Sequence, residues 1–204
     1  GPSPRDLPSE GWQLAEILAE LLPTEPEVRG LAALVSFSLA RVPARTDAEG
    51  RFVPLAHQDP GRWDRKLIDR GNAHLAATQR HRQLGRFQLE AAIQALHCTR
   101  IDGAAPDPRL LLELHRCLAA SAPALGAVTA LAAVTGEVHG AVAGLTVLDA
   151  GGDAAVRYQP AWVTRAHLLH TLHRHDEALA ALDKGISLTH DPAARQHLLS
   201  QRET

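Results

Sequence analysis

The feature of this sequence that most restricts its fold is a helical spacing of apolar residues between prolines. Apolar residues recur every three or four positions, as along one face of an α-helix. The thirteen prolines fall where these periodic segments begin or end, because proline cannot continue a helix interior. We therefore predict an all-α fold of about ten helices joined as antiparallel hairpins. The expected helices cover residues 10–22, 26–41, 61–84, 86–101, 108–120, 123–135, 138–149, 156–173, 175–188 and 191–201.

Composition favours helices over strands. Hydrophobic residues make up 45% of the chain and aromatic residues only 3%, and most of the apolar content is Ala and Leu, which are strong helix formers. Two cysteines, Cys98 and Cys117, do not suggest a disulfide framework. No apolar run approaches the roughly 18 residues of a membrane span, and the start of the chain does not resemble a signal peptide. We expect a cytoplasmic protein without a membrane partner.

Several shorter signals predict local structure. Gly1-Pro2-Ser3 and the absence of Met suggest the remainder of a cleaved tag ahead of a single helical domain over 4–204, taken from a longer protein. In the first helix Ala15, Leu18 and Leu22 share a face. Residues 43–61 lack a helical period and form an unusually long connection. Gly85 is expected to end the third helix, and Gly136 to form a tight turn.

Charge is unevenly distributed although the net charge is only −2. Residues 1–30 hold six acids against Arg5 and Arg29, and residues 60–86 hold seven bases against Asp64 and Asp69. One interpretation is that these are two solvated helix faces. The other is that they are complementary docking surfaces. The small net charge argues against a stand-alone nucleic-acid binder.

A repeat pattern is clearest over residues 159–192. The pattern begins with a large residue, Trp162, and has small residues four and sixteen positions later, Ala166 and Ala178. A large residue, Leu182, and a small residue, Gly185, follow four and seven positions after Ala178. Small residues let two antiparallel helices approach closely, and large ones fill the next groove. Leu125, Thr129, Ala141, Leu145 and Leu148 repeat the pattern more weakly. The spacing predicts a tetratricopeptide-like bundle, a kind of array that presents surfaces to peptides or proteins. The alternative is an ordinary Ala-rich hairpin.

No motif indicates catalysis or a cofactor. Phosphate loops, dinucleotide loops and nucleophile elbows are absent from the sequence, so we expect a protein that is not an enzyme. His167, His170 and His173 lie three apart and could share a metal. The alternative, which we favour, is that they are polar residues on an exposed helix face, and we expect no metal.

From Leu14 to His97 the chain resembles the C-terminal extension of a group of bacterial extracytoplasmic-function RNA polymerase sigma factors. The matching residues are Leu21–Val28, Gly30–Leu34, Ala40-Arg41, Ala44-Arg45, Asp47–Gly50, Gln58-Asp59, Arg62–Arg65, Leu67-Ile68, Gly85–Ile93 and His97. Arg165-Ala166, His175, Glu177-Ala178 and Ala181 fit the closing repeat of that family. Residues 107–109 and 122–131 depart from its pattern.

The resemblance implies a regulatory domain that modulates transcription initiation. Its partners would be the sigma domains of the same chain, the RNA polymerase core or a regulatory protein, and DNA would be contacted only through N-terminal domains outside these 204 residues. The alternative function is a free-standing tetratricopeptide-like scaffold, or a metal-responsive helical domain, unrelated to transcription.

We place the expected protein-binding surface on the long connection and the helix after it. Its residues are Gln58, Asp59, Arg62, Trp63 and Asp64, with Arg86, Phe87 and Gln88 adjoining. Functional residues concentrate on loops, and Trp and Arg are favoured at the centres of interfaces. The alternative for Trp63 is that it only fastens the loop to the bundle.

Overall fold

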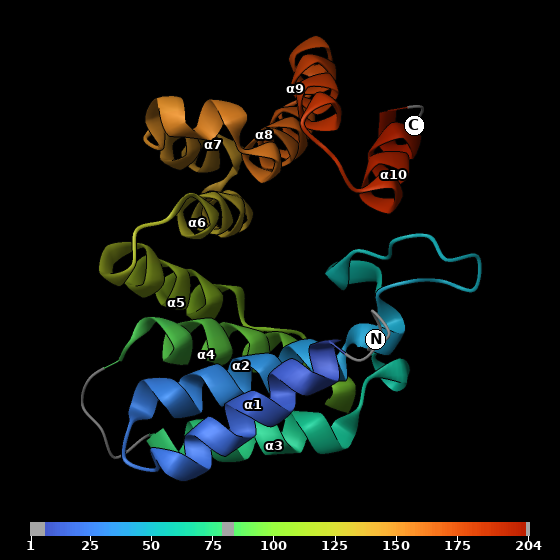
Figure 1. Ribbon diagram of the computed structural model, residues 1–204. Coiled ribbons are helices and arrows are strands. Elements are labelled where there is room, and N and C mark those ends of the chain that lie inside the picture. Colours follow the sequence, from blue (N-terminus) through green and yellow to red (C-terminus); the bar gives the residue numbers. More distant parts are fainter. Residues whose placement is uncertain (1–6, 79–83, 203–204) are drawn as a thin grey trace. The chain divides into compact units, whose positions relative to one another are not determined.

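The computed structural model describes residues 7–78 and 84–202, and this part of the chain contains ten α-helices (Figure 1). The helices are α1 (Leu7–Leu21), α2 (Pro26–Ala40), α3 (Arg65–Thr78), α4 (Arg86–Cys98), α5 (Pro108–Ser121), α6 (Leu125–His139), α7 (Ala141–Asp149), α8 (Gln159–Thr171), α9 (His175–Ser187) and α10 (Pro192–Arg202). The predicted all-α fold is therefore confirmed. The single domain expected over 4–204 divides into two compact units, with α1 to α4 in unit 1, and α5 to α10 and residues 47–52 in unit 2.

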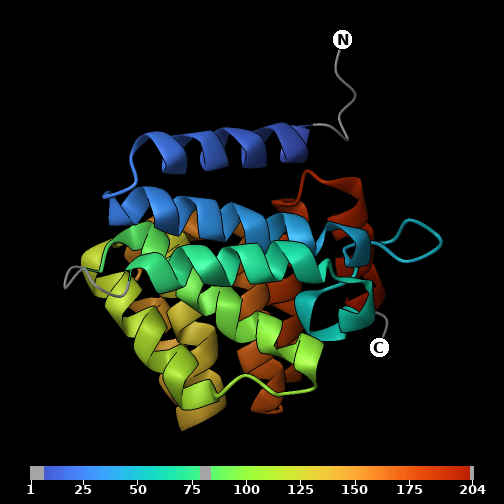
Figure 2. The same ribbon diagram turned by 90° about the horizontal axis from the view of Figure 1, so that it is seen from below.

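Unit 1 is organised around α2, which packs against α1, α3 and α4. Figure 2 shows α1 as an outer helix that runs beside α2. The Phe37 ring of α2 is fully buried, and Gly71 of α3 leaves space for it, since a Cβ there would lie 2.8 Å from the ring. At Gly30 a Cβ would lie 2.6 Å from the backbone nitrogen of Gln88. These two glycines allow α3 and α4 to approach α2 closely.

The long connection contains three short 3-10 turns: Val42–Ala44, Leu55–His57 and Pro60–Arg62. The predicted helix start at residue 61 is wrong, because the side chain of Asp64 caps α3 and accepts hydrogen bonds from the backbone nitrogens of Lys66 (2.9 Å) and Leu67 (3.2 Å). The predicted end of that helix, residues 79–84, falls mostly outside the described residues.

Two predicted glycine roles are wrong. Gly85 precedes α4 as its N-cap instead of ending the helix before it. Gly136 lies within α6, where a Cβ would meet the side chain of Leu168 at 2.4 Å. The turn between α6 and α7 is made by Gly140, whose φ of 92° strongly favours glycine. The sequence alone did not distinguish a glycine needed for a turn from one needed for close helix packing.

Unit 2 contains two consecutive helical hairpins, α6–α7 and α8–α9. In the first, Gly144 of α7 lies against the backbone of α6, and a Cβ there would be 2.7 Å from the carbonyl oxygen of Ala132. In the second, Ala166, Ala178 and Leu182 belong to the core of unit 2, with Trp162 packed at its edge. Gly185 is buried against Val163 and Trp162. The predicted repeat residues therefore make the contacts between α8 and α9.

Candidate protein-binding groove

Trp63, the expected interface residue, is a core residue of unit 1. Its side chain is only 5% exposed and packs with Phe37, Ala40 and Ala44. The guanidinium of Arg100 lies over its ring at 5.5 Å from the centroid. The same guanidinium donates hydrogen bonds to the carbonyl oxygens of Leu55 (2.6 Å), Ala56 (3.1 Å) and Gln58 (3.1 Å). Trp63 and Arg100 thus fasten the long connection to the helices, as in the alternative interpretation of Trp63.

The neighbouring predicted residues mainly hold the connection in shape. Gln58 is buried and donates to the carbonyl oxygen of Val53 at 3.1 Å. Asp59 accepts from the backbone nitrogen of Gly61 at 2.9 Å. Arg62 donates to the carbonyl oxygen of Thr46 at 3.0 Å. Asp59, Arg62 and Asp64 remain exposed, but their polar atoms are used in local turns and caps. These contacts stabilise the shape of the connection, and the binding role of its exposed residues stays a prediction.

Arg86, Phe87 and Gln88 lie at the opposite end of α4 from Arg100. The 13 residues of α4 place these ends about 18 Å apart, so the structure does not join the two predicted groups into one surface. The carboxylate of Glu27 on α2 accepts hydrogen bonds from the backbone nitrogens of Phe87 (2.9 Å) and Gln88 (3.1 Å). A carboxylate at a helix start satisfies unpaired N–H groups and the helix dipole.

The predicted histidine trio is only partly brought together. The His170 and His175 rings lie 5.5 Å apart, and those of His173 and His175 lie 5.9 Å apart. His167 has no ring contact with them. Across the described residues, no group of three or more His, Cys, Asp or Glu side chains is arranged to hold a metal ion.

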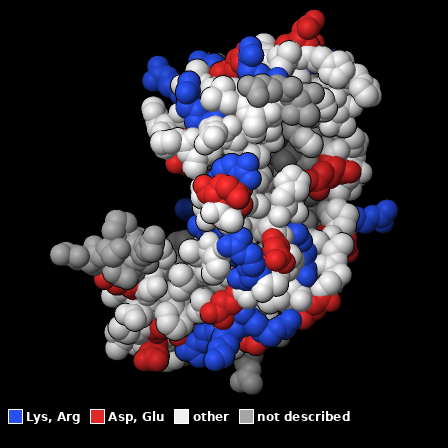
Figure 3. All heavy atoms as spheres, turned by 90° about the vertical axis from the view of Figure 1, so that its right-hand side faces the viewer, with Lys and Arg blue, Asp and Glu red and all other residues white. Residues whose placement is uncertain are grey.

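The acidic and basic regions of the sequence meet inside unit 1. Glu16 of α1 is bound by Arg70 and His74 of α3, with its Oε1 2.8 Å from His74 Nε2. Burial alone would raise the pKa of Glu16, but these hydrogen bonds outweigh it and lower the pKa below its usual value. On the face of the molecule displayed in Figure 3, acidic and basic side chains are interspersed. Some charged residues of the acidic and basic regions therefore pair with each other and attach α1 to α3.

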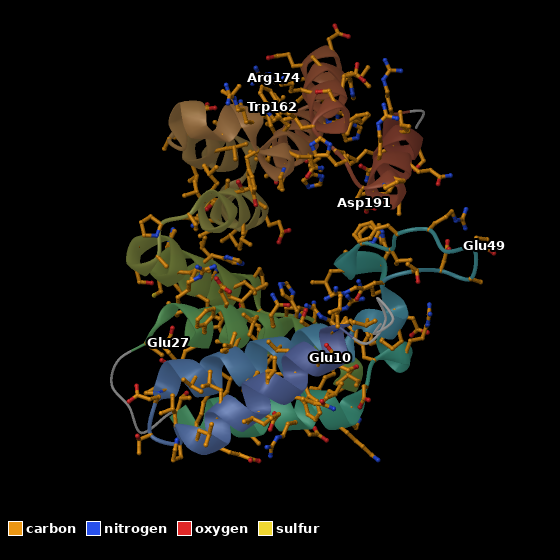
Figure 4. All side chains as sticks on the ribbon, viewed as in Figure 1. Glu10, Glu27, Glu49, Trp162, Arg174 and Asp191 are labelled. Atoms are coloured by element: carbon orange, nitrogen blue, oxygen red, sulfur yellow. The ribbon has the colours of Figure 1, made fainter. Side chains whose placement is uncertain are left out.

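A groove in unit 2 has the properties of a peptide-binding surface. It has a volume of about 670 Å³ and is lined by residues of α7, α8 and α9 and by Arg174, which precedes α9. Leu145, Leu169 and Ala181 form a buried apolar floor, and Val142 is 65% exposed at its edge. Figure 4 shows the labelled side chains of Trp162 and Arg174 near one another in this unit.

Charged side chains surround this floor. Arg165 pairs with Asp149 and lies 5.9 Å from the centroid of the Trp162 ring. Arg174 pairs with Glu177 through two hydrogen bonds of 2.7 and 2.6 Å; this pairing raises the pKa of Arg174 and lowers that of Glu177. Lys184 is exposed on the same rim. An apolar floor with a charged rim suits the capture of an apolar side chain next to a carboxylate.

Most of these groove residues were not predicted from the sequence. The α8–α9 hairpin was predicted from its inward residues and Arg165 entered only through the family resemblance, whereas outward residues such as Lys184 were not singled out. The sequence did contain a signal for them. Once the packing residues of a repeat are assigned, the charged residues between them on the same helix are candidates for the binding surface.

Comparison with known proteins gives a partial match. Residues 2–79, which include α1, α2 and α3, match a family of unknown function, DUF6596. Over 196 residues, or 96% of the chain, the sequence is 31% identical to Uncharacterized protein R00370 of Rhizobium meliloti (strain 1021). The match covers 46% of that protein, so the chain spans about half the length of the curated relative. No solved structure matches.

None of the described helices combines the length and the apolar character needed to cross a bilayer.

Proposed function

We propose that this chain is the regulatory, protein-interaction domain of an extracytoplasmic-function sigma factor, and that it acts by binding. Support comes from the sequence resemblance between Leu14 and His97. The relative R00370 is consistent with this role, because its matched part is accompanied by a longer remainder. In the proposed full-length protein that remainder would carry the sigma domains, and DNA would be contacted only there.

The observation that carries the binding role is the groove between α7, α8 and α9. Its floor offers apolar surface, and its rim offers Arg174 and Lys184 to a partner. Among the described residues Lys184 has no ion-pair partner, so it is available to a carboxylate of a bound protein. The sigma domains, the polymerase core or a regulatory protein would supply that segment.

The test is a charge reversal at the groove in the full-length protein. We expect Lys184→Glu to change promoter-dependent transcription by RNA polymerase about tenfold, the effect of roughly 1.4 kcal/mol of lost binding. Arg195→Glu makes the same charge change on α10, also in unit 2, on an exposed residue that does not line the groove. It should leave transcription unchanged.

The outcomes separate the alternatives. Equal transcription from the Lys184→Glu variant, the Arg195→Glu variant and the unmodified protein would overturn the proposed role of the groove. Binding of a partner without any effect on transcription would favour a free-standing scaffold. Stoichiometric zinc retained by the purified protein would favour the metal-responsive alternative.

A further inference from the structure

Helix α1 is turned so that its large apolar side chains point outward. The side that packs on α2 holds the small residues Ala15 and Ala19. Glu16 is buried beside them, and Trp12 donates a hydrogen bond to Ser36 at 3.0 Å. The large apolar residues are exposed, from 37% for Leu18 to 72% for Leu21: Leu7, Leu14, Ile17, Leu18, Leu21 and, directly after the helix, Leu22. Of the three residues predicted to share a face, Ala15 is therefore buried, whereas Leu18 and Leu22 are exposed.

The exposed residues form one continuous stripe. At about 100° per residue, their directions span an arc of about 140° along a helix about 22 Å long. This is the width of the apolar stripe with which a helix normally faces a core. We call these six residues the outer face of α1. Figure 2 shows that α2 lies on the other side of α1, and Ile17, at the edge of the stripe, also lines a cleft with Leu67 and Arg70 of α3. A contiguous exposed apolar stripe of this kind marks an interaction site.

One charged residue lies within the outer face. On the helical wheel Glu10 falls between Ile17 and Leu21, and its side chain is exposed. A partner that covers the stripe must therefore desolvate this carboxylate or pair it with a base. The occupant of the outer face should combine an apolar stripe with a Lys or Arg.

This requirement disfavours a second copy of the same helix. The 15 residues of α1 contain no Lys, Arg or His. In a symmetric pair of α1 helices Glu10 would meet apolar residues or acids of the other copy, and no base. The sequence therefore points to a different helix as the occupant.

We infer that the outer face of α1 is covered, in the full-length protein, by a basic amphipathic helix of the same polypeptide that lies outside these 204 residues. The inference rests on the proposed function, in which the domain docks on the sigma domains. The 46% coverage of R00370 shows that a related protein has ample further chain for such a helix. A base of that helix pairs with Glu10, and its apolar residues pack between Leu14, Ile17 and Leu21.

The test is photocrosslinking within the full-length protein. A benzophenone amino acid replaces Leu14 on the outer face or, as a control on the same helix, Gln13 beside it. From Leu14 we expect intramolecular crosslinks, mapped by mass spectrometry to an apolar segment with Lys or Arg outside the 204 residues. The yield should fall about fivefold or more when Glu10→Lys is added, and stay unchanged when Gln13→Lys is added.

Three results would overturn the inference: crosslinks that join two copies, crosslinks only within the 204 residues, or equal yields from Leu14 and Gln13. The groove test is independent of these results. If Lys184→Glu alters transcription but no such crosslink forms, the inference about α1 fails and the proposed function stands. If the crosslink forms but Lys184→Glu has no effect, the proposed role of the groove fails.

Discussion

Helices α1 and α9 are both amphipathic, but they place their large apolar residues on opposite sides. Helix α9 buries Leu182 and Ile186 together with Ala178, Ala181 and Gly185, and it exposes charged residues such as Asp176 and Lys184. Helix α1 buries Ala15, Glu16 and Ala19 and exposes its leucines. Helix α9 thus buries its large apolar residues within its own helical hairpin. Helix α1 has the composition of a helix that packs on two sides.

The two helices are consequently held by different forces. Helix α9 is held by apolar burial against α8, in which Gly185 permits close approach. Helix α1 buries little apolar volume and relies on polar contacts: Glu16 with Arg70 and His74, and Trp12 with Ser36. A strong hydrophobic pattern in the sequence therefore identifies a helix but does not tell which side meets the core.

The same substitution made in both helices tests whether α1 and α9 differ in this way. Leu182→Ala should lower the free energy of unfolding by about 2–4 kcal/mol, because it leaves a cavity in the core of unit 2. Leu14→Ala, at a side chain that is 67% exposed, should change it by less than about 0.5 kcal/mol. Urea denaturation followed by circular dichroism measures both. A large cost for Leu14→Ala would mean that the outer face of α1 is already covered within this chain.

A second pair of substitutions tests the polar attachment of α1. Glu16→Gln should cost about 1–3 kcal/mol, because the buried His74 loses its charged partner. Glu10→Gln, the same change on the exposed side, should have little effect. Amide hydrogen exchange of residues 10–21 reports the loosening of α1. Equal protection in the two variants would contradict the attachment through Glu16.

The attachment should also depend on pH. Because the pKa of Glu16 is lowered in the fold, the ionised carboxylate stabilises the folded state. Its contribution is complete above the usual pKa of about 4.5 and is lost as the pH falls below that value through the lowered pKa. Protection of α1 should therefore fall at acid pH in the unmodified protein, and the Glu16→Gln variant should show a smaller fall. An equal pH dependence in both proteins would exclude Glu16 as its source.

Local patterns predicted the helices and the α8–α9 hairpin well. Trp162, Ala166, Ala178, Leu182 and Gly185 make their contacts within one hairpin, so their spacing in the sequence contains the information needed. The same holds for the helix segments between prolines, where the errors are confined mainly to helix ends.

The sequence did not decide between the two interpretations of Trp63, because its burial depends on contacts between distant residues. Trp63 is buried through Phe37 and Arg100, which lie 26 and 37 residues away in the sequence. The start of α4 is capped by Glu27, about 60 residues earlier. A Trp beside Arg and Asp in a loop has the composition of an interface and also of an anchored connection, and only the tertiary fold distinguishes the two.

The smallest expected effect gives the finest comparison of the two helices. Leu18 on α1 and Leu179 on α9 are similarly exposed, at 37% and 43%, so the change to Ala should cost each about 0.5 kcal/mol or less in this chain. In the full-length protein the costs should separate, because Leu18 would then pack against the basic helix proposed above and Leu179 would remain as it is. We expect Leu18→Ala to cost about 1 kcal/mol more there than Leu179→Ala, measured by urea denaturation of both proteins. Equal costs in the full-length protein would mean that α1 keeps its outer face exposed.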